Sequence, residues 1–285
     1  MKLKKILTAI WNEFVYGGHL LSFGAASIVF TSAILLGIKI TWDCLLVVYL
    51  GTQSVYLYNH FKEFDKDSLT NPQRSEHIEK YVKYIPLITL FFSLTAIVIV
   101  IYFNKILALL FGLLMLFGGL LYSKFLKKFT RRIIGFKDFL ISFLWATLVI
   151  FLAYYYFFSW NFALILMVLF IFLRLFLNTN FFDMKDVESD IKEGLLTLPV
   201  ILGKKTLIKF LTIINMLSMI PIIFGVFLDI LPNFSLILLL TIPYSFYYLK
   251  QTSKESVDLR FLSYVLVDGE YLLWSIFILL GKNLL

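Results

Sequence analysis

Apolar segments of membrane-spanning length recur along this sequence and leave little choice of fold. A transmembrane helix needs roughly 20 mostly apolar residues. We expect nine such spans, at about residues 17–38, 41–59, 84–103, 105–122, 138–158, 160–179, 207–228, 233–249 and 259–281. Very short turns join the first eight into four pairs, and longer polar loops separate the pairs. The pattern predicts an all-α, polytopic membrane protein, with residues 1–285 forming a single integral membrane domain.

Composition supports a membrane protein over a soluble one. Only 15 % of the residues are charged and 60 % are hydrophobic, whereas a soluble domain has roughly 25 % charged residues. The single cysteine, Cys44, excludes a disulfide within the chain. The N-terminal segment lacks the short apolar core and small-residue cleavage site of a signal peptide, so we interpret it as a lead-in to the first span.

Basic residues indicate on which side of the membrane the loops lie. Of the 26 Lys and Arg residues, 22 lie in the N-terminal tail, in loops 60–83, 123–137 and 180–209, or in segment 250–260. Loops rich in Lys and Arg stay in the cytoplasm. We therefore expect a multi-pass cell-membrane protein whose N-terminus and long loops are cytoplasmic and whose C-terminus is outside. The net charge of +8 is then a topology signal, and we expect no nucleic-acid partner.

The segment NHFKEFDKD, residues 59–67, places polar side chains where the second span stops. Asn59, Glu63 and Asp67 are spaced four residues apart, so on a helix that continues past the membrane they share an arc of about 80°. His60 lies at the edge of that arc. We expect these side chains to form one polar face at the cytoplasmic surface.

A second acidic cluster follows the sixth span, in DMKDVESD from residue 183. On a continuous helix Asp183, Asp186 and Asp190 share an arc of about 60°, while Lys185 and Glu188 face the other way. An offset of 123 residues aligns the clusters and superposes His60, Glu63 and Asp67 on Asp183, Asp186 and Asp190. Each cluster runs into a Thr-x-Pro sequence. We interpret the match as an internal duplication, which predicts two pseudo-repeated halves.

Two interpretations of these acids compete. Acidic residues at helix ends often only meet water and pair with nearby lysines. Repetition in register favours a site, because like charges four residues apart oppose helix formation and so require a cation. Carboxylate and amide oxygens suit Mg²⁺, which completes its coordination with water and substrate phosphate, whereas the dispersed histidines give a zinc site little support. The expected metal ligands are Asn59, Glu63, Asp67, Asp183, Asp186 and Asp190.

These segments resemble the two motifs of the UbiA superfamily of intramembrane prenyltransferases. The first is similar to the family's N-D-x-x-D-x-x-x-D motif, with His60 and Glu63 where the family usually has aspartates. The second, together with the TLPVILG that follows it, matches closely, and the resemblance covers essentially the whole chain. It implies nine helices around a central cavity, with active-site loops 60–83, 123–137 and 180–209.

The resemblance also implies an activity. The family transfers an isoprenyl group from an isoprenyl diphosphate to an aromatic or lipid acceptor in the membrane, through a carbocation-like transition state. Two Mg²⁺ ions are bridged by the diphosphate. By this resemblance the six expected ligands are catalytic, Tyr122 is a pocket tyrosine, and the substrate contacts are His60, Lys127 and Lys124. Topology alone offers the alternative explanation for the two lysines, since they lie in a basic cytoplasmic loop.

Polar residues inside the later spans are costly and need a partner or a cavity. Arg174 lies about two to three turns before Asp183; it either faces the cavity and binds phosphate or an acidic group of the acceptor, or pairs structurally. We expect Asn178 to line the same cavity mouth and contact substrate. Asp268 and Glu270 should face the bundle interior.

Three other functions stay open. A secondary transporter would also have a repeat and charges within its spans, but its ion sites belong near the bilayer midplane, whereas these acids lie at helix ends. A terpene cyclase of the same superfamily would use the same metal sites without an acceptor. A non-catalytic scaffold gains support from His60 and Glu63 and loses more from the intact second cluster.

Overall fold

The computed structural model describes every residue except 1, 122–126, 253, 255–256 and 285. The described residues form helices joined by short loops, without a β-strand. In chain order the elements are α1 (Lys2–Tyr16), α2 (His19–Leu35), α3 (Trp42–Lys62), α4 (Phe64–Thr70), α5 (Pro72–Glu79), η1 (Val82–Tyr84), α6 (Ile85–Tyr102), α7 (Ile106–Leu121), α8 (Lys127–Thr130), α9 (Phe136–Ala146), α10 (Leu148–Tyr155), α11 (Phe162–Asp183), α12 (Val187–Lys192), α13 (Leu198–Leu217), α14 (Ile220–Phe227), η3 (Asn233–Leu240), α15 (Thr241–Gln251), α16 (Leu259–Phe261), η4 (Leu262–Val267) and α17 (Asp268–Leu284).

Each apolar segment that the sequence marks as a span falls on helical structure. The first four correspond to α2, α3, α6 and α7, and the sixth to α11. Others are interrupted: the fifth is divided between α9 and α10, and the seventh between α13 and α14. The second interruption has a local cause, because Pro221 lies in the first turn of α14 and has no N–H with which to continue the preceding helix.

Five stretches of the described chain are long and apolar enough to cross a membrane. They are Val82–Tyr102, Phe136–Tyr155, Phe162–Asp183, Leu198–Phe227 and Leu259–Leu284. Helices α1 and α2 would make a sixth if this pair, bent by 59°, forms one broken span. The all-α, multi-pass architecture is thus confirmed, whereas the number nine stays a prediction.

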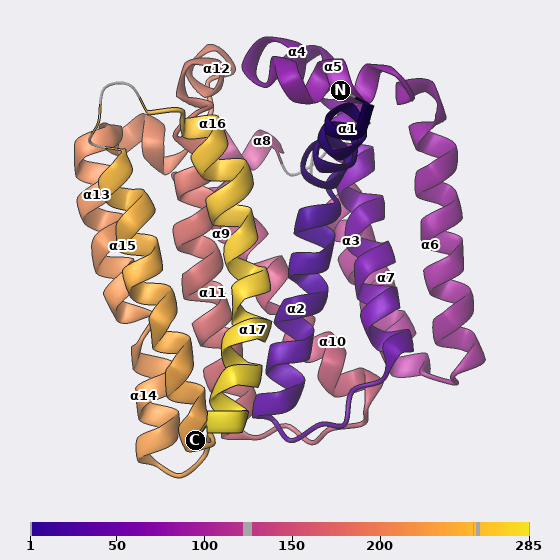
Figure 1. Cartoon of the computed structure of the whole chain (residues 1–285), viewed down its shortest axis with the longest axis vertical. Helices are drawn as coiled ribbons and strands as arrows, with labels where there is room; N and C mark the ends of the chain where they lie inside the picture. Colours follow the sequence, from indigo (N-terminus) through magenta and orange to yellow (C-terminus); the bar gives the residue numbers. More distant parts are fainter. Residues whose placement is uncertain (1, 122–126, 253, 255–256, 285) are drawn as a thin grey trace.

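The bundle brings both acidic segments to one end of the molecule. Figure 1 shows α4, α5 and α12 at the same end as α1, with the C-terminal end of α17 at the opposite end. Helix α3 packs on α6, α11 packs on α9 and α13, and α17 packs along α2. The last helix therefore closes the bundle against one of the first.

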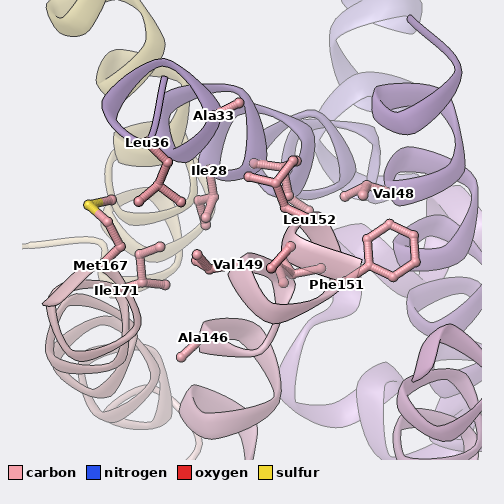
Figure 2. Packing of buried hydrophobic residues seen from close by; sticks show 14 of the residues in the cluster. Ile28, Ala33, Leu36, Val48, Ala146, Val149, Phe151, Leu152, Met167 and Ile171 are labelled. Atoms are coloured by element: carbon pink, nitrogen blue, oxygen red, sulfur yellow. The ribbon is translucent and has the colours of Figure 1, made fainter. Parts of the chain in front are cut away.

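The main apolar core lies where α2, α10 and α11 meet, close to α3 (Figure 2). Ile28 of α2, Leu152 of α10 and Met167 of α11 are fully buried there. Within a membrane such helices associate through close packing, which small residues favour. Gly24 of α2 is one such residue, because a Cβ on it would lie 3.2 Å from Cβ of Tyr271 in α17.

Candidate active site

A large cavity of about 370 Å³ lies within the bundle and reaches both acidic segments. Much of its lining is apolar and comes from α3, α6, α7 and α10, including Val48, Ile97, Leu109 and Phe151. Its polar lining includes acids, amides, a histidine and three cations, among them Asn59, His60, Glu63, Asp67, Arg74, Lys137, Asp183, Lys185 and Asp186. The two segments that the sequence pattern pairs therefore meet at one cavity.

The first cluster keeps a helical register although its helix is interrupted. Helix α3 ends at Lys62 and α4 begins at Phe64, with Glu63 between them at φ −107°. The backbone N–H of Glu63 still donates to Asn59 O at 2.9 Å, and that of Asp67 donates to Glu63 O at 2.8 Å. Because this spacing of four residues survives, all three side chains reach the cavity.

Hydrogen bonds from two side chains hold the Asp67 carboxylate. Its Oδ1 accepts hydrogen bonds from Arg74 Nη2 at 2.6 Å and from Asn71 Nδ2 at 3.1 Å. His60 Nδ1 lies 3.8 Å from Asp67 Oδ2. Asn59 differs, because its Oδ1 is buried and has no hydrogen-bond partner among the described residues.

The second cluster does not lie on one helix. Helix α11 ends at Asp183 and α12 begins only at Val187, so the chain turns between them. The expectation that Lys185 faces away is therefore wrong: Lys185 lines the cavity, and its Nζ donates to Asp186 Oδ2 at 2.6 Å. From α9, Lys137 Nζ donates to Asp183 Oδ1 at 2.7 Å.

The same turn moves Asp190 away from its two companions. Asp190 is fully buried, is absent from the cavity lining, and accepts a hydrogen bond from Thr197 Oγ1 at 3.2 Å. The N–H of Leu195 also donates to its carbonyl oxygen at 2.9 Å. The shared 60° arc that a continuous helix would give is wrong here, and Asp190 ties together the loop that leads to α13.

The charges around Asp186 stabilise its ionised form. Burial alone raises the pKa of Asp186, but Lys185 and Lys137 outweigh burial and hold the pKa below its ordinary value. Burial lowers the pKa of Lys185, and the ion pair with Asp186 offsets only part of this effect. The second cluster therefore presents an ionised acid beside a partly desolvated lysine.

Three buried oxygens at the cavity lack any hydrogen-bond partner within the described chain. They are Asn59 Oδ1, Asp183 Oδ2 and Asp186 Oδ1, and all three residues line the cavity. Buried polar atoms normally have partners, so these oxygens point to something that binds there. One amide and two carboxylate oxygens are a donor set that Mg²⁺ accepts.

The protein alone does not form a closed metal cage. In the part of the chain that the structure describes, no three His, Cys, Asp or Glu side chains come close enough together to hold a metal ion. This arrangement suits Mg²⁺, which commonly uses one or two carboxylates and leaves its other positions to water and substrate phosphate. The residues present therefore fit the ion when a phosphate-bearing substrate supplies the remaining oxygens.

Most of the site residues expected in the loop after α7 lie outside the described part of the chain. Tyr122 and Lys124 lie outside the described residues, and Lys127 begins α8 while its side chain lies outside them. Their roles stay predictions.

Arg174 lies away from the cavity and is held by a buried polar network. It is fully buried, its Nε donates to Glu270 Oε1 at 3.0 Å, and Nη1 donates to Asn215 Oδ1 at 2.5 Å. This placement favours the structural pairing over contact with substrate. Asn178 does line the cavity, and its Nδ2 donates to the Tyr271 hydroxyl at 3.1 Å.

Sequence reasoning missed the residues that join the two clusters. Tyr264 of η4 has the Arg74 guanidinium and the Lys185 ammonium each 5.4 Å from its ring centre, and its hydroxyl donates to Asn71 Oδ1. On the sequence alone, the positive-inside rule accounts for Arg74, Lys137 and Lys185. The available signal was that these cations lie within a few residues of an acidic motif or begin a span.

Comparison with known proteins identifies the fold and the family. The model of the UbiA prenyltransferase family matches residues 20–276. A UbiA homologue from Aeropyrum pernix K1, solved without ligand, is similar with a TM-score of 0.66 at 16 % identity, covering 92 % of this chain and 96 % of that one. A homologue from Archaeoglobus fulgidus, solved bound to GPP and Mg²⁺, also gives 0.66 at 16 % identity, covering 95 % and 98 %.

A third similar structure is described as that of digeranylgeranylglyceryl phosphate synthase. It has a TM-score of 0.58 at 19 % identity and covers 97 % of this chain and 95 % of that chain. No curated protein matches the sequence significantly.

Proposed function

We propose how this chain, which belongs to the UbiA prenyltransferase family, carries out prenyl transfer with its own residues. The protein is a membrane prenyltransferase of the all-α UbiA fold. The proposal adds that it transfers an isoprenyl group, in a Mg²⁺-dependent reaction, from a diphosphate to an aromatic or lipid acceptor held in the same cavity. The observation that carries it is the set of oxygens from both acidic segments that line one cavity and have no hydrogen-bond partner among the described residues.

The acidic segments hold Mg²⁺ between them in this proposal. Asp183 and Asp186 contribute carboxylate oxygens from one side, and Asn59, Glu63 and Asp67 contribute oxygens from the other. Mg²⁺ bound there neutralises the diphosphate and stabilises the charge that develops on it as the allylic carbon–oxygen bond breaks. We propose two ions, one associated with each segment.

Three cations complete the diphosphate site. Lys137, Lys185 and Arg74 line the cavity and pair with Asp183, Asp186 and Asp67. When the diphosphate enters, their N–H groups can donate to its oxygens, and the carboxylates they leave become free for metal. Each charge-assisted hydrogen bond of this kind contributes roughly 1.5–3 kcal/mol.

The apolar part of the cavity receives the prenyl chain and excludes water. Aromatic rings lie next to the polar lining: Trp145 stacks on Tyr271 with ring centres 5.7 Å apart, and Tyr56 lies 6.3 Å from Trp145. All three residues line the cavity. Their faces can stabilise the positive charge on the allylic carbon by cation–π attraction.

We further propose that the site opens to the cytoplasm. Basic loops 60–83, 123–137 and 180–209 belong on the cytoplasmic side by the positive-inside rule, with the C-terminus outside. The chain then acts as a single membrane domain whose donor arrives from the cytoplasm and whose acceptor arrives from the bilayer.

Purified protein in lipid nanodiscs tests the proposal. Labelled GPP or DMAPP is supplied with a panel of hydroxylated aromatic and glycerol-lipid acceptors, with and without Mg²⁺. We expect product and diphosphate only with Mg²⁺, and a loss of about 10³-fold in Asp186→Ala, comparable to removal of a main electrostatic stabiliser. Glu63→Ala should lose about 10²-fold. Asp65→Asn, at an exposed position of α4, is the matched control.

The outcomes separate the alternatives. Unchanged Mg²⁺-dependent turnover in both Asp186→Ala and Glu63→Ala would show that the metal site is wrongly assigned. Diphosphate release that needs no acceptor, together with a cyclic hydrocarbon product, would indicate a terpene cyclase. Vectorial uptake into vesicles without diphosphate release would indicate a transporter.

A further inference from the structure

Asp268 is an acidic residue of the cavity that belongs to neither cluster. It is the first residue of α17, lies one turn before Tyr271, and lines the cavity together with that tyrosine. Its side chain is half-buried, and in the described part of the chain it has no hydrogen-bond or ion-pair partner. A carboxylate in such surroundings is costly, and no hydrogen bond or ion pair within the described residues offsets that cost.

The backbone before Asp268 is also unusual. Residues Leu262–Val267 form a π-helical segment that leads directly into α17. Such wider turns are frequent at functional sites, and they rotate the side chains that follow relative to a regular α-helix. The segment therefore sets the direction in which Asp268 enters the cavity.

The charges near Asp268 are already committed elsewhere. Lys185 and Arg74 act on it electrostatically, but Lys185 is bonded to Asp186 and Arg74 to Asp67. Asp268 is thus not the primary counter-ion of either cation. Its carboxylate faces the cavity beside Tyr271 and Asn178, where a second substrate would meet the donor.

We propose that Asp268 binds the hydroxyl group of the acceptor and accepts its proton, an inference that rests on the proposed prenyl transfer. The acceptor oxygen forms a bond to C1 of the prenyl group. The bond between C1 and the diphosphate oxygen breaks, and its electron pair leaves with the diphosphate. The hydroxyl proton passes to the Asp268 carboxylate. The acceptor is therefore an alcohol or phenol whose hydroxyl is free.

The main test uses Asp268→Asn, which keeps the shape of the side chain but cannot accept the proton. The probe acceptors are 4-hydroxybenzoate, 1-naphthol and a monoalkylglycerol, with GPP as donor. We expect kcat with the hydroxyl acceptor to fall about 10²- to 10³-fold, the usual range for a lost general base. The KM for GPP and the Mg²⁺ concentration for half-maximal rate should stay within about threefold of wild type, which also shows that the variant is folded.

A binding measurement separates hydroxyl recognition from a structural role. Each probe competes with its own O-methyl ether for protein loaded with Mg²⁺ and inorganic diphosphate. Wild type should prefer at least one hydroxyl probe by about tenfold or more, because the ether leaves the carboxylate unpaired. Asp268→Asn should reduce this preference to about threefold or less, while Asp65→Asn should keep it.

Several results would overturn the inference. It fails if wild type shows no preference for any hydroxyl probe, or if Asp268→Asn keeps kcat within threefold. A tenfold shift in Mg²⁺ dependence would assign Asp268 to the metal site instead. Failure of the proposed function is a different result: wild type would then release no diphosphate from GPP with any acceptor.

Discussion

The two acidic segments are related by an offset of 123 residues in the sequence, yet they fold differently. The first keeps its spacing of four residues across the junction of α3 and α4, so Asn59, Glu63 and Asp67 all reach the cavity. The second turns between α11 and α12, and Asp190 leaves the cavity lining. A sequence repeat thus predicts which segments meet, whereas a local turn decides which side chains line the cavity.

The two segments also differ in the chemical type of their buried oxygens that have no partner among the described residues. Among the described residues, the second segment has two buried carboxylate oxygens without a partner, on Asp183 and Asp186, whereas in the first segment it is the neutral amide oxygen of Asn59 that lacks one. Hard cations are attracted more strongly to carboxylates than to amides. We therefore expect the second segment to bind Mg²⁺ more tightly.

Counterpart residues of the repeat give the sharpest test of this comparison. Asp67→Asn should lower Mg²⁺-dependent transfer about 10²-fold, in the range for loss of one electrostatic stabiliser. Asp190→Asn should keep the transfer rate within about threefold and instead lower the thermal unfolding temperature, because a buried hydrogen-bonded carboxylate is lost. Initial rates and thermal unfolding in the same detergent measure both. Equal losses of rate would show that the turn at residues 184–186 does not remove Asp190 from the site.

Lys185→Met tests whether the cavity cations bind the diphosphate or only neutralise the acidic side chains. Loss of one charge-assisted hydrogen bond should raise the KM for GPP about 10- to 100-fold, with a smaller change in kcat. Steady-state kinetics at saturating Mg²⁺ measure the effect, and Lys192→Met, at the exposed last residue of α12, is the control. An unchanged KM would mean that Lys185 only neutralises Asp186.

The smallest expected effect comes from making the first motif more like the family pattern. His60→Asp adds a carboxylate beside Asp67, so the Mg²⁺ concentration for half-maximal rate should fall about threefold, following the dependence of affinity on ligand charge. A magnesium titration of the initial rate measures this shift. A higher Mg²⁺ concentration for half-maximal rate would instead show that His60 itself favours Mg²⁺ binding at the first segment.

Much of the fold follows from the sequence because lipid imposes simple rules. Every backbone polar group in the bilayer must be paired within its segment, so long apolar runs had to become helices. The interruptions were harder to predict, since the break between α9 and α10 at Thr147 has no proline or glycine to mark it. Helical spacing also assumes continuity, and it failed where α11 ends at Asp183.

The sequence predicts the site residues that belong to the repeated acidic motif. It does not predict the residues that reach the site only through tertiary contacts. Asn59, Glu63, Asp67, Asp183 and Asp186 line the cavity as a pair of motifs should. Tyr264 and Lys137 carry no local pattern, because their importance comes from tertiary contacts with residues far along the chain. Arg174 shows the opposite case: its position inside a span drew attention, but Glu270 accounts for it.

The packing of α17 on α2 has a consequence for how the molecule is made. Asp268 and Tyr271 complete the cavity wall, and Gly24 of α2 gives Tyr271 the room to do so. During synthesis the early helices enter the bilayer before α17 exists, so the face of α2 that packs on α17 is not yet covered. The cavity cannot enclose a reactive carbocation until this late segment has been inserted. A nascent chain is therefore not expected to hydrolyse the prenyl diphosphate before its fold is complete.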